Sequence, residues 1–211
     1  MLCGMAPPDD LAGWRRAQRI ALLARRMALA PEQRVLQQAA ITETLLTHFT
    51  PGAGTVVALY WPFKGEFDPR HVARHWRARG VRTVLPVVVE KARPLQFREW
   101  WPGVATRPGV FGLPVPQGME LLLPDLLLVP PVGFDAQCFR LGYGGGYYDR
   151  TLAELVGRTV QRIGVAFELS RMDTISPQSY DIAMDVVVTE AGIHHPRKQS
   201  ADAGVARLSP C

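Results

Sequence analysis

The sequence predicts an α/β fold: a three-layer arrangement in which a mainly parallel sheet is covered by helices on both faces. Short β-branched segments alternate along the chain with segments whose apolar residues recur at helical spacing. With 211 residues, 47% of them hydrophobic, the chain can bury a substantial core in one domain. In such sheets ligands bind at the carboxyl ends of the strands.

Two helices are expected at the start of the chain. From Asp9 to about Leu29, leucines and alanines recur at helical spacing and five arginines lie on the other faces, which predicts an amphipathic helix. A second helix is expected from Pro31, a residue suited to a first helical turn, and it ends before the segment TPGAG.

A β-α-β unit follows. The segment TVVALYWP is short and β-branched, and VRTVLPVVV is also strand-like. Between them, DPRHVARHWRARG offers Asp68 as an N-cap, a proline at the first helical position and a terminal glycine.

The second half of the chain repeats this alternation. After PLQFREW and a Pro/Gly-rich passage over residues 101–117, the expected strand DLLLVP leads into a glycine-rich loop and a helix near residues 148–156. The strands RIGVAF and DVVVT complete the set. The chain from His194 onward has the composition of a disordered tail, so we expect one domain over residues 1–195 and a flexible tail over residues 196–211.

Composition narrows the class of protein. The sequence lacks an apolar run long enough to cross a bilayer and a signal-peptide pattern, so we expect a cytoplasmic protein. Cys3, Cys138 and Cys211 are odd in number and widely spaced, so we expect free thiols rather than disulfides or a zinc site. The net charge of +5 comes mostly from arginine, which suits phosphate or carboxylate ligands, although genomic base composition can produce the same bias.

The segment RLGYGGGYYDR, residues 140–150, carries the strongest functional signal. It connects an expected buried strand to a helix, so successive glycines let backbone N–H groups approach an anion beside the helix N-terminus. It lacks the Gly-Lys-Ser/Thr of a Walker A loop, and Tyr147 stands where a dinucleotide loop has its third glycine. A phosphate cradle is favoured over a tight turn without a ligand.

The longer segment GFDAQCFRLGYGGGYYDRTL resembles the glycine-rich motif of the 5-formyltetrahydrofolate cyclo-ligase family, and the resemblance spans nearly the whole chain. VVALYWPFKGEFDP is similar to the family's strand that ends in Gly-Glu-x-Asp, and FGLPVP stands where the family has a short Pro-containing element. YDIAMDVVVT is similar to its C-terminal strand, and the pair Arg15/Arg19 matches an N-terminal basic pattern.

The resemblance implies a fold similar to the NagB/RpiA/CoA-transferase-like fold. It also implies that ATP and Mg²⁺ drive the cyclisation of 5-formyltetrahydrofolate to 5,10-methenyltetrahydrofolate, with release of ADP and phosphate. The implied route is phosphorylation of the formyl oxygen, attack by N10 and departure of phosphate. This chemistry needs positioning and charge neutralisation more than a protein nucleophile. We expect reduced folate and ATP as the partners, and neither nucleic acid nor a membrane; the sequence leaves the oligomeric state open.

By matching positions, the resemblance also implies roles for particular residues. The ATP-binding set is Arg15, Arg19, Arg140, Gly142, Gly144, Gly145, Gly146, Tyr147 and Tyr148. Arg19 and Arg140 are the implied catalytic pair, and Asp149 and Asp181 are the implied Mg²⁺ ligands. The folate-contacting set is Trp61, Glu66, Tyr147 and Tyr148, because aromatic faces pack on a pterin and a carboxylate accepts its N–H groups.

Each assignment has a structural alternative. A run of five arginines on one helix is usually a solvated face, and Trp61 is more often a core residue than a ligand contact. Asp149 can serve only as the N-terminal charge of its helix, and Asp181 only as a turn former. The five histidines show no metal-binding spacing, and His71 and His75 are expected to share an exposed helix face.

Some positions depart from the family pattern. Val115 stands where the family has Glu, Cys138 where it has Gly, Arg15 where it has Lys, and Tyr180 where it often has His. A diverged paralogue that binds ATP or a pterin-like ligand without this reaction is therefore one alternative. A basic nucleic-acid-binding protein is another, although acidic residues dilute the basic half and no recognised motif is present.

Overall fold

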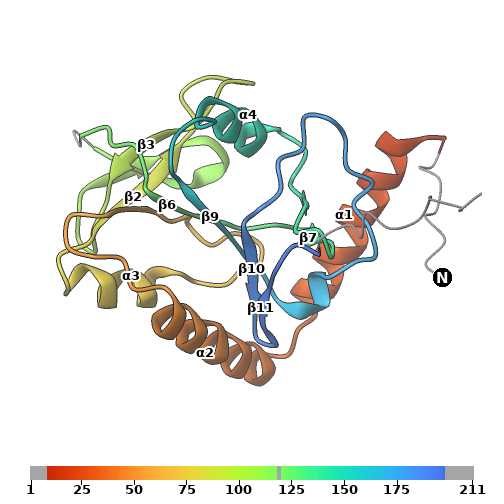
Figure 1. Ribbon diagram of the computed structural model, residues 1–211, viewed down its shortest axis with the longest axis horizontal. Coiled ribbons are helices and arrows are strands. Elements are labelled where there is room, and N and C mark those ends of the chain that lie inside the picture. Colours follow the sequence, from red (N-terminus) through yellow and green to blue (C-terminus); the bar gives the residue numbers. More distant parts are fainter. Residues whose placement is uncertain (1–8, 118–119, 198–211) are drawn as a thin grey trace, which may run out of the picture.

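The computed structural model describes residues 9–117 and 120–197, and within them the main sheet has the strand order β11-β10-β9-β6-β1-β2-β3 (Figure 1). The strand bounds are β1 Val56–Ala58, β2 Arg82–Val87, β3 Gln96–Glu99, β6 Leu126–Val129, β9 Gln161–Val165, β10 Val186–Thr189 and β11 Gly192–His194. The neighbouring strands from β10 to β2 run parallel, while the edge strands β3 and β11 are antiparallel to their neighbours. The predicted mainly parallel sheet is confirmed.

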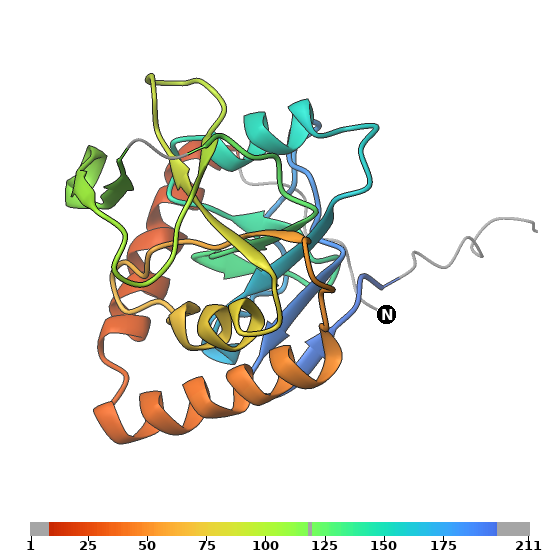
Figure 2. The ribbon, with the colours of Figure 1, turned by 90° about the vertical axis from the view of Figure 1, so that its left-hand side faces the viewer.

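Helices cover both faces of this sheet. Their bounds are α1 Leu11–Met27, α2 Pro31–His48, α3 Arg70–Arg77 and α4 Tyr147–Glu154, with short 3₁₀ helices η1 Val110–Gly112 and η2 Glu168–Ser170. Helices α2 and α3 lie on one face and α4 on the other, whereas α1 runs along one side of the sheet (Figures 1 and 2). The three-layer α/β arrangement is therefore confirmed.

The core lies on both faces because the central strands are apolar at consecutive positions. Leu128 packs in a cluster with Ile41 of α2 and Trp76 of α3, while its neighbour Leu127 packs with Leu152 of α4. Successive side chains of a strand point to opposite faces, so a strand buried on both sides reads as a continuous apolar run.

Helix α1 is seated against segments that follow the strands. Leu22 packs with Val132, Leu141 and Ile175 in a third cluster. These neighbours lie in or beside a small ribbon, β7 Gly133–Phe134 and β8 Arg140–Leu141, and in the loop before β10. Gly133 permits the close approach, since a Cβ there would lie 2.6 Å from Leu22 Cδ1. The helix α1 therefore stands beside the carboxyl ends of the strands.

The structure differs from the expected elements in two places of this region. Pro69 rather than Asp68 is the N-cap of α3, although Asp68 Oδ1 accepts a hydrogen bond from the Arg70 N–H. The Pro/Gly-rich passage, for which no strand was predicted, contains a hairpin, β4 Thr106–Pro108 and β5 Pro114–Pro116. Val115 is buried there, so at this position the chain has an apolar packing residue.

The tail-like composition that begins at His194 does not mark the end of the fold, and the tail expected over residues 196–211 stays a prediction. His194 ends β11, and its ring Nε2 lies 2.7 Å from a Glu168 carboxylate oxygen. The Arg197 N–H donates to the Ala136 carbonyl oxygen at 3.1 Å, which extends the ordered chain to the limit of the described residues. Antiparallel pairing with β10 gives this segment backbone partners that composition does not reveal.

Other expectations concern surface and thiols. Cys138 is a buried free thiol, while Cys3 and Cys211 lie outside the described residues. His71 and His75 are both exposed, as predicted.

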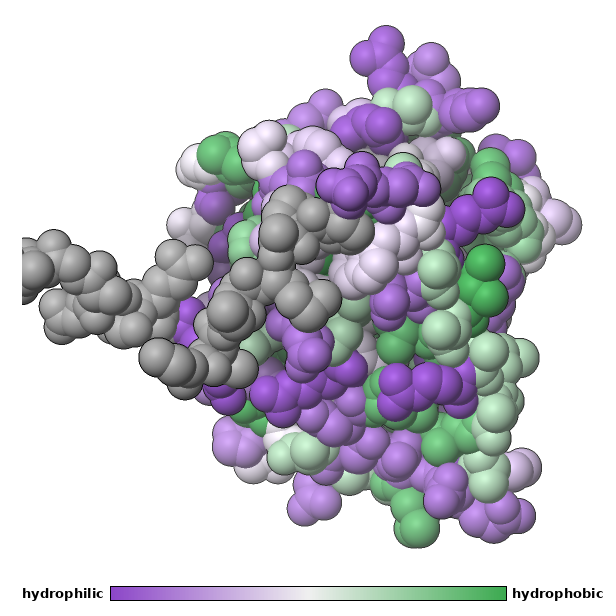
Figure 3. All heavy atoms as spheres, turned by 90° about the vertical axis from the view of Figure 1, so that its right-hand side faces the viewer, coloured by the Kyte–Doolittle hydropathy of each residue, from purple (hydrophilic) through white to green (hydrophobic). Residues whose placement is uncertain are grey.

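Among the described helices, none is long and apolar enough to cross a membrane. The face that carries α1 mixes hydrophilic and hydrophobic side chains (Figure 3).

Candidate active site

Two arginines of α1 are buried although they lie on an amphipathic helix. Arg15 is 8% exposed and Arg26 is 3% exposed, whereas Arg16 and Arg25 are exposed and Arg19 is half-buried. The interpretation of this run as a solvated face is therefore wrong for Arg15 and Arg26. Their positions and that of Arg19 follow the i, i+4, i+11 spacing of one helix face, a signal by which Arg26 could have been predicted.

Arg15 connects α1 to the loop between β9 and β10. Its Nε donates to the Ile175 carbonyl at 3.2 Å, and its Nη2 donates to the Ser176 carbonyl at 2.9 Å and to Asp181 Oδ2 at 2.5 Å. Asp181 also accepts the Gln178 N–H at 2.7 Å, so its role as a turn former is present beside the ion pair. Charge pairing and carbonyl acceptors together compensate the buried guanidinium.

Arg26 connects α1 to three further segments. Its Nε donates to the Lys64 carbonyl at 3.0 Å, in the loop after β1, and its Nη1 donates to the Pro131 carbonyl at 3.3 Å, after β6. Its Nη2 donates to the Tyr143 hydroxyl at 2.6 Å. Three segments that are distant in sequence therefore meet at one guanidinium.

Arginine side chains bind the carbonyl oxygens of the glycine loop. Arg19 Nε donates to the Gly142 carbonyl at 2.7 Å, and Arg150 Nη1 donates to the Gly145 carbonyl at 2.9 Å. Within the part of the chain that the structure describes, the backbone N–H groups of residues 142–146 donate no hydrogen bond. The loop thus presents a row of amide donors just before the N-terminus of α4.

Backbone conformation explains why glycine occupies this loop. Gly144 and Gly146 have φ values of +94° and +66°, a region that disfavours residues with a Cβ. Gly142 has no positive φ, and a Cβ built there meets no atom within 4 Å. The space beside Gly142 is therefore open to a ligand.

Arg140 and Asp149 form an ion pair beneath the loop. Arg140 is 5% exposed; its Nη1 donates to the Ile182 carbonyl at 2.6 Å and its Nη2 to Asp149 Oδ1. Burial lowers the pKa of Arg140, and burial raises the pKa of Asp149 against the opposing attraction of Arg140. Asp181 also raises the pKa of Asp149, so the two carboxylates act on one another electrostatically.

Glu66 lies in the loop after β1 and contacts the glycine loop through Tyr143. It is 7% exposed, and its Oε2 accepts the Phe63 N–H at 2.9 Å while its Oε1 accepts the Tyr143 hydroxyl at 2.6 Å. Arg26 Nη2 is 3.7 Å from the same Oε1. Burial raises the pKa of Glu66 to about 7, because these partners offset only part of the lost hydration.

Two further tyrosines, Tyr60 and Tyr148, lie within electrostatic range of this carboxylate. Tyr60 is 3% exposed, and its hydroxyl has no hydrogen-bond partner among the described residues. Burial raises the pKa values of Tyr60 and Tyr148, and the charge of Glu66 raises both further. An unsatisfied buried hydroxyl is uncommon in proteins. Tyr60 was not predicted, since nothing in the sequence distinguishes it from a core aromatic.

Trp61 follows Tyr60 and is partly buried. Its ring makes an edge contact with Trp100, the ring centroids being 6.1 Å apart, and the Arg70 guanidinium lies 4.5 Å from its centroid. These contacts support the interpretation of Trp61 as a packing residue; its contact with substrate stays a prediction.

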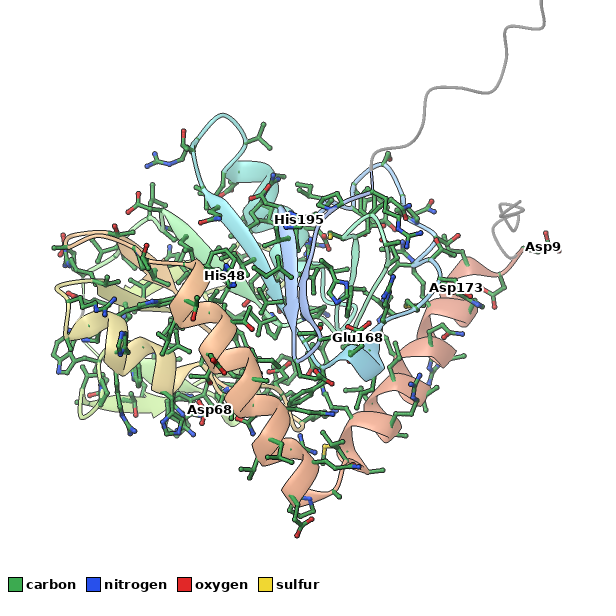
Figure 4. All side chains as sticks on the ribbon, turned by 60° about the horizontal axis from the view of Figure 1, so that its bottom comes forward. Asp9, His48, Asp68, Glu168, Asp173 and His195 are labelled. Carbon is green, nitrogen blue, oxygen red and sulfur yellow. The ribbon has the colours of Figure 1, made fainter. Side chains whose placement is uncertain are left out.

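Among the described residues, no group of three or more His, Cys, Asp and Glu side chains lies close enough together to hold a metal ion. The labelled residues Asp9, His48, Asp68, Glu168, Asp173 and His195 lie on separate parts of the fold (Figure 4). Any site based on Asp149 and Asp181 must therefore complete its ligand set from other oxygen atoms.

Comparison with known proteins assigns the chain to a family. The family model described as the 5-formyltetrahydrofolate cyclo-ligase family matches residues 12–190. The 5-formyltetrahydrofolate cyclo-ligase of Escherichia coli (strain K12) is 32% identical over 176 residues, which cover 80% of this chain and 96% of that protein. The corresponding enzyme of Mycolicibacterium smegmatis is 36% identical over 146 residues, covering 65% of this chain and 74% of that protein.

Solved structures give the same result. The 5,10-methenyltetrahydrofolate synthetase of Aquifex aeolicus matches with a TM-score of 0.74 and 26% identity, covering 92% of this chain and 99% of that one. The synthetase of Mycoplasma pneumoniae matches with a TM-score of 0.68 and 26% identity, covering 83% of this chain and 98% of that one.

The raised pKa of Glu66 predicts a pH-dependent loss of stability. Between the ordinary value of 4.5 and about 7, the unfolded chain releases the Glu66 proton while the folded chain retains it. The free energy of unfolding of the parent should therefore fall as pH rises through this window, relative to Glu66→Gln, by at most about 3 kcal/mol. Urea unfolding of both proteins at several pH values measures the difference. A difference that does not change with pH would show that Glu66 ionises normally.

Proposed function

This chain belongs to the 5-formyltetrahydrofolate cyclo-ligase family, and from that membership we propose that the site beside α1 performs the family's ring closure with ATP and Mg²⁺. The protein is a ligase of folate one-carbon metabolism that converts 5-formyltetrahydrofolate to 5,10-methenyltetrahydrofolate. The use of ATP and Mg²⁺, the release of ADP and phosphate, and the residue roles below are the proposal, as are a single domain over residues 1–195 and a cytoplasmic location.

The observation that carries the ATP part is the row of backbone N–H groups over residues 142–146, which lack partners in the described chain. These donors, beside the α4 N-terminus and the open space at Gly142, fit the oxygens of a polyphosphate. When bound, ATP would supply the phosphoryl group that makes the formyl oxygen a leaving group. Arg15, Arg19 and Arg140 balance the phosphate charge in this proposal.

The donor set also fits Mg²⁺. This cation is commonly held by one or two carboxylates together with phosphate oxygens and water. Asp149 and Asp181 lie in one electrostatic network, each paired with an arginine. Both carboxylates would hold the cation, which would neutralise phosphate charge. The buried guanidinium groups of Arg140 and Arg15 keep Asp149 and Asp181 in position.

The folate part rests on the buried Glu66. Its carboxylate is an acceptor for ring N–H groups, and Tyr60 and Tyr148 provide phenols around it. The unpartnered Tyr60 hydroxyl offers a further polar contact. In this proposal Trp61, Tyr147 and Tyr148 contribute aromatic surface to the bound ring.

Gly142→Ala tests the phosphate cradle, because the unliganded protein has room for the added methyl group. We expect unchanged unfolding but a Michaelis constant for ATP raised roughly tenfold, the equivalent of weakening one hydrogen bond to a charged group. Steady-state kinetics over ATP concentration measures this constant. Gly52→Ala is the matched control, since a Cβ at Gly52 also meets no atom within 4 Å. Equal Michaelis constants in all three proteins would exclude the cradle beside Gly142.

Asp149→Asn and Asp181→Asn should each raise the Mg²⁺ concentration for half-maximal activity about tenfold, because the amide keeps the shape but loses the charge that attracts the cation. Activity is measured across a Mg²⁺ titration, and urea unfolding checks that Arg140 and Arg15 remain accommodated. Asp173→Asn removes an exposed carboxylate and serves as the control. Titration curves identical to the parent's would make both carboxylates purely structural.

Glu66→Gln replaces an acceptor oxygen with a donor and should weaken folate binding about tenfold or more, a loss on the order of 1–3 kcal/mol. Binding of a non-hydrolysable ATP analogue should hardly change, because the glutamine amide oxygen can still accept the Tyr143 hydroxyl. Calorimetric titration with 5-formyltetrahydrofolate and with the analogue measures both, and Glu43→Gln, at an exposed position of α2, is the control. Equal loss of both ligands would mean that Glu66 supports the fold instead of contacting folate.

A further inference from the structure

Tyr143 interrupts the glycine loop with a large side chain whose hydroxyl points inward. The residue as a whole is 41% exposed, yet its hydroxyl donates to Glu66 Oε1 and accepts from Arg26 Nη2, both at 2.6 Å. Its ring also lies 5.9 Å from the ring of Phe63. The side chain of Tyr143 therefore connects the glycine loop to Glu66, the proposed folate contact.

The hydrogen bond from Tyr143 occupies Glu66 Oε1, an acceptor that the proposed folate substrate requires. Glu66 Oε2 already accepts the Phe63 N–H, and Oε1 accepts Tyr143. Because Glu66 is buried and Tyr143 is the partly exposed member of the pair, a ligand that reaches Oε1 from solvent meets the phenol first. The Tyr143 hydroxyl thus stands where a ring N–H donor of the folate would bond.

The backbone on both sides of Tyr143 is glycine. Gly144 has a φ of +94°, and Gly142 has open space around its α-carbon. Glycine gives a chain access to many conformations, so these two residues allow the tyrosine to leave Glu66 without disturbing α4.

We propose that Tyr143 is a positioning residue that holds Glu66 and the glycine loop together in the free enzyme and yields Glu66 to the folate ring. Its release frees the loop to close on phosphate, so folate and ATP strengthen one another's binding. This inference rests on the proposed function, since it takes Glu66 as the acceptor for the folate ring. By linkage, the factor by which folate improves nucleotide binding equals the factor by which nucleotide improves folate binding.

The test is calorimetric titration of the parent and Tyr143→Phe with 5-formyltetrahydrofolate, with a non-hydrolysable ATP analogue, and with each ligand in the presence of the other. Removing the competing hydroxyl should tighten folate binding about threefold to tenfold. The variant should also bind the analogue alone with the affinity that the parent shows only when folate is bound. Tyr180→Phe, which removes the hydroxyl of an exposed tyrosine, should behave as the parent.

The outcomes separate this inference from the proposed function. A parent that binds no folate contradicts both. If the parent binds folate and Tyr143→Phe binds it with equal or lower affinity, the proposed function stands and the inference fails. Coupling between the two ligands that persists unchanged in Tyr143→Phe also overturns the inference, and a merely structural role for Tyr143 would leave that coupling intact.

Discussion

The burial of guanidinium groups on α1 is the constraint on which the site depends. A buried arginine must replace its hydration with acceptors, and Arg15 and Arg26 find them in loop carbonyls and carboxylates rather than on their own helix. Those carbonyls belong to loops that follow β1, β6 and β9. Helix α1 therefore fixes the loops at the carboxyl edge of the sheet relative to one another, although it covers neither face of the sheet.

Arginine side chains also determine which backbone groups of the glycine loop stay open to a ligand. Arginines take the carbonyl oxygens of Gly142 and Gly145, which leaves the backbone N–H groups for a ligand. A loop whose carbonyl groups are partly occupied and whose N–H donors are open favours anions, and the N-terminus of α4 adds to this preference. The cationic side chains thus act on the loop twice, by binding its carbonyls and by adding positive charge beside it.

Glu66 illustrates how burial shapes the other end of the site. Its carboxylate has an ion partner and two hydrogen-bond donors, yet its pKa is raised to about 7 because burial outweighs them. Burial places this carboxylate in a medium of low polarity, where each hydrogen bond contributes more than it does in water. A ligand that donates N–H groups to this carboxylate would compensate the desolvation cost of burying Glu66, which the free enzyme already carries.

The sequence by itself determined the alternation of the main strands and helices and the position of the glycine loop, because periodicity and Gly-rich motifs are local signals, while the arginine pair was indicated by the resemblance to the family. Only the tertiary structure decided that Arg26 and Tyr143 belong with Glu66, since these residues meet through contacts between α1 and loops that are distant in the chain. It also decided that His194 ends a strand rather than beginning a tail, because the partner strand supplies hydrogen bonds that composition cannot reveal. Burial, and with it the pKa of Glu66, is a property of the assembled neighbours and has no local sequence signal.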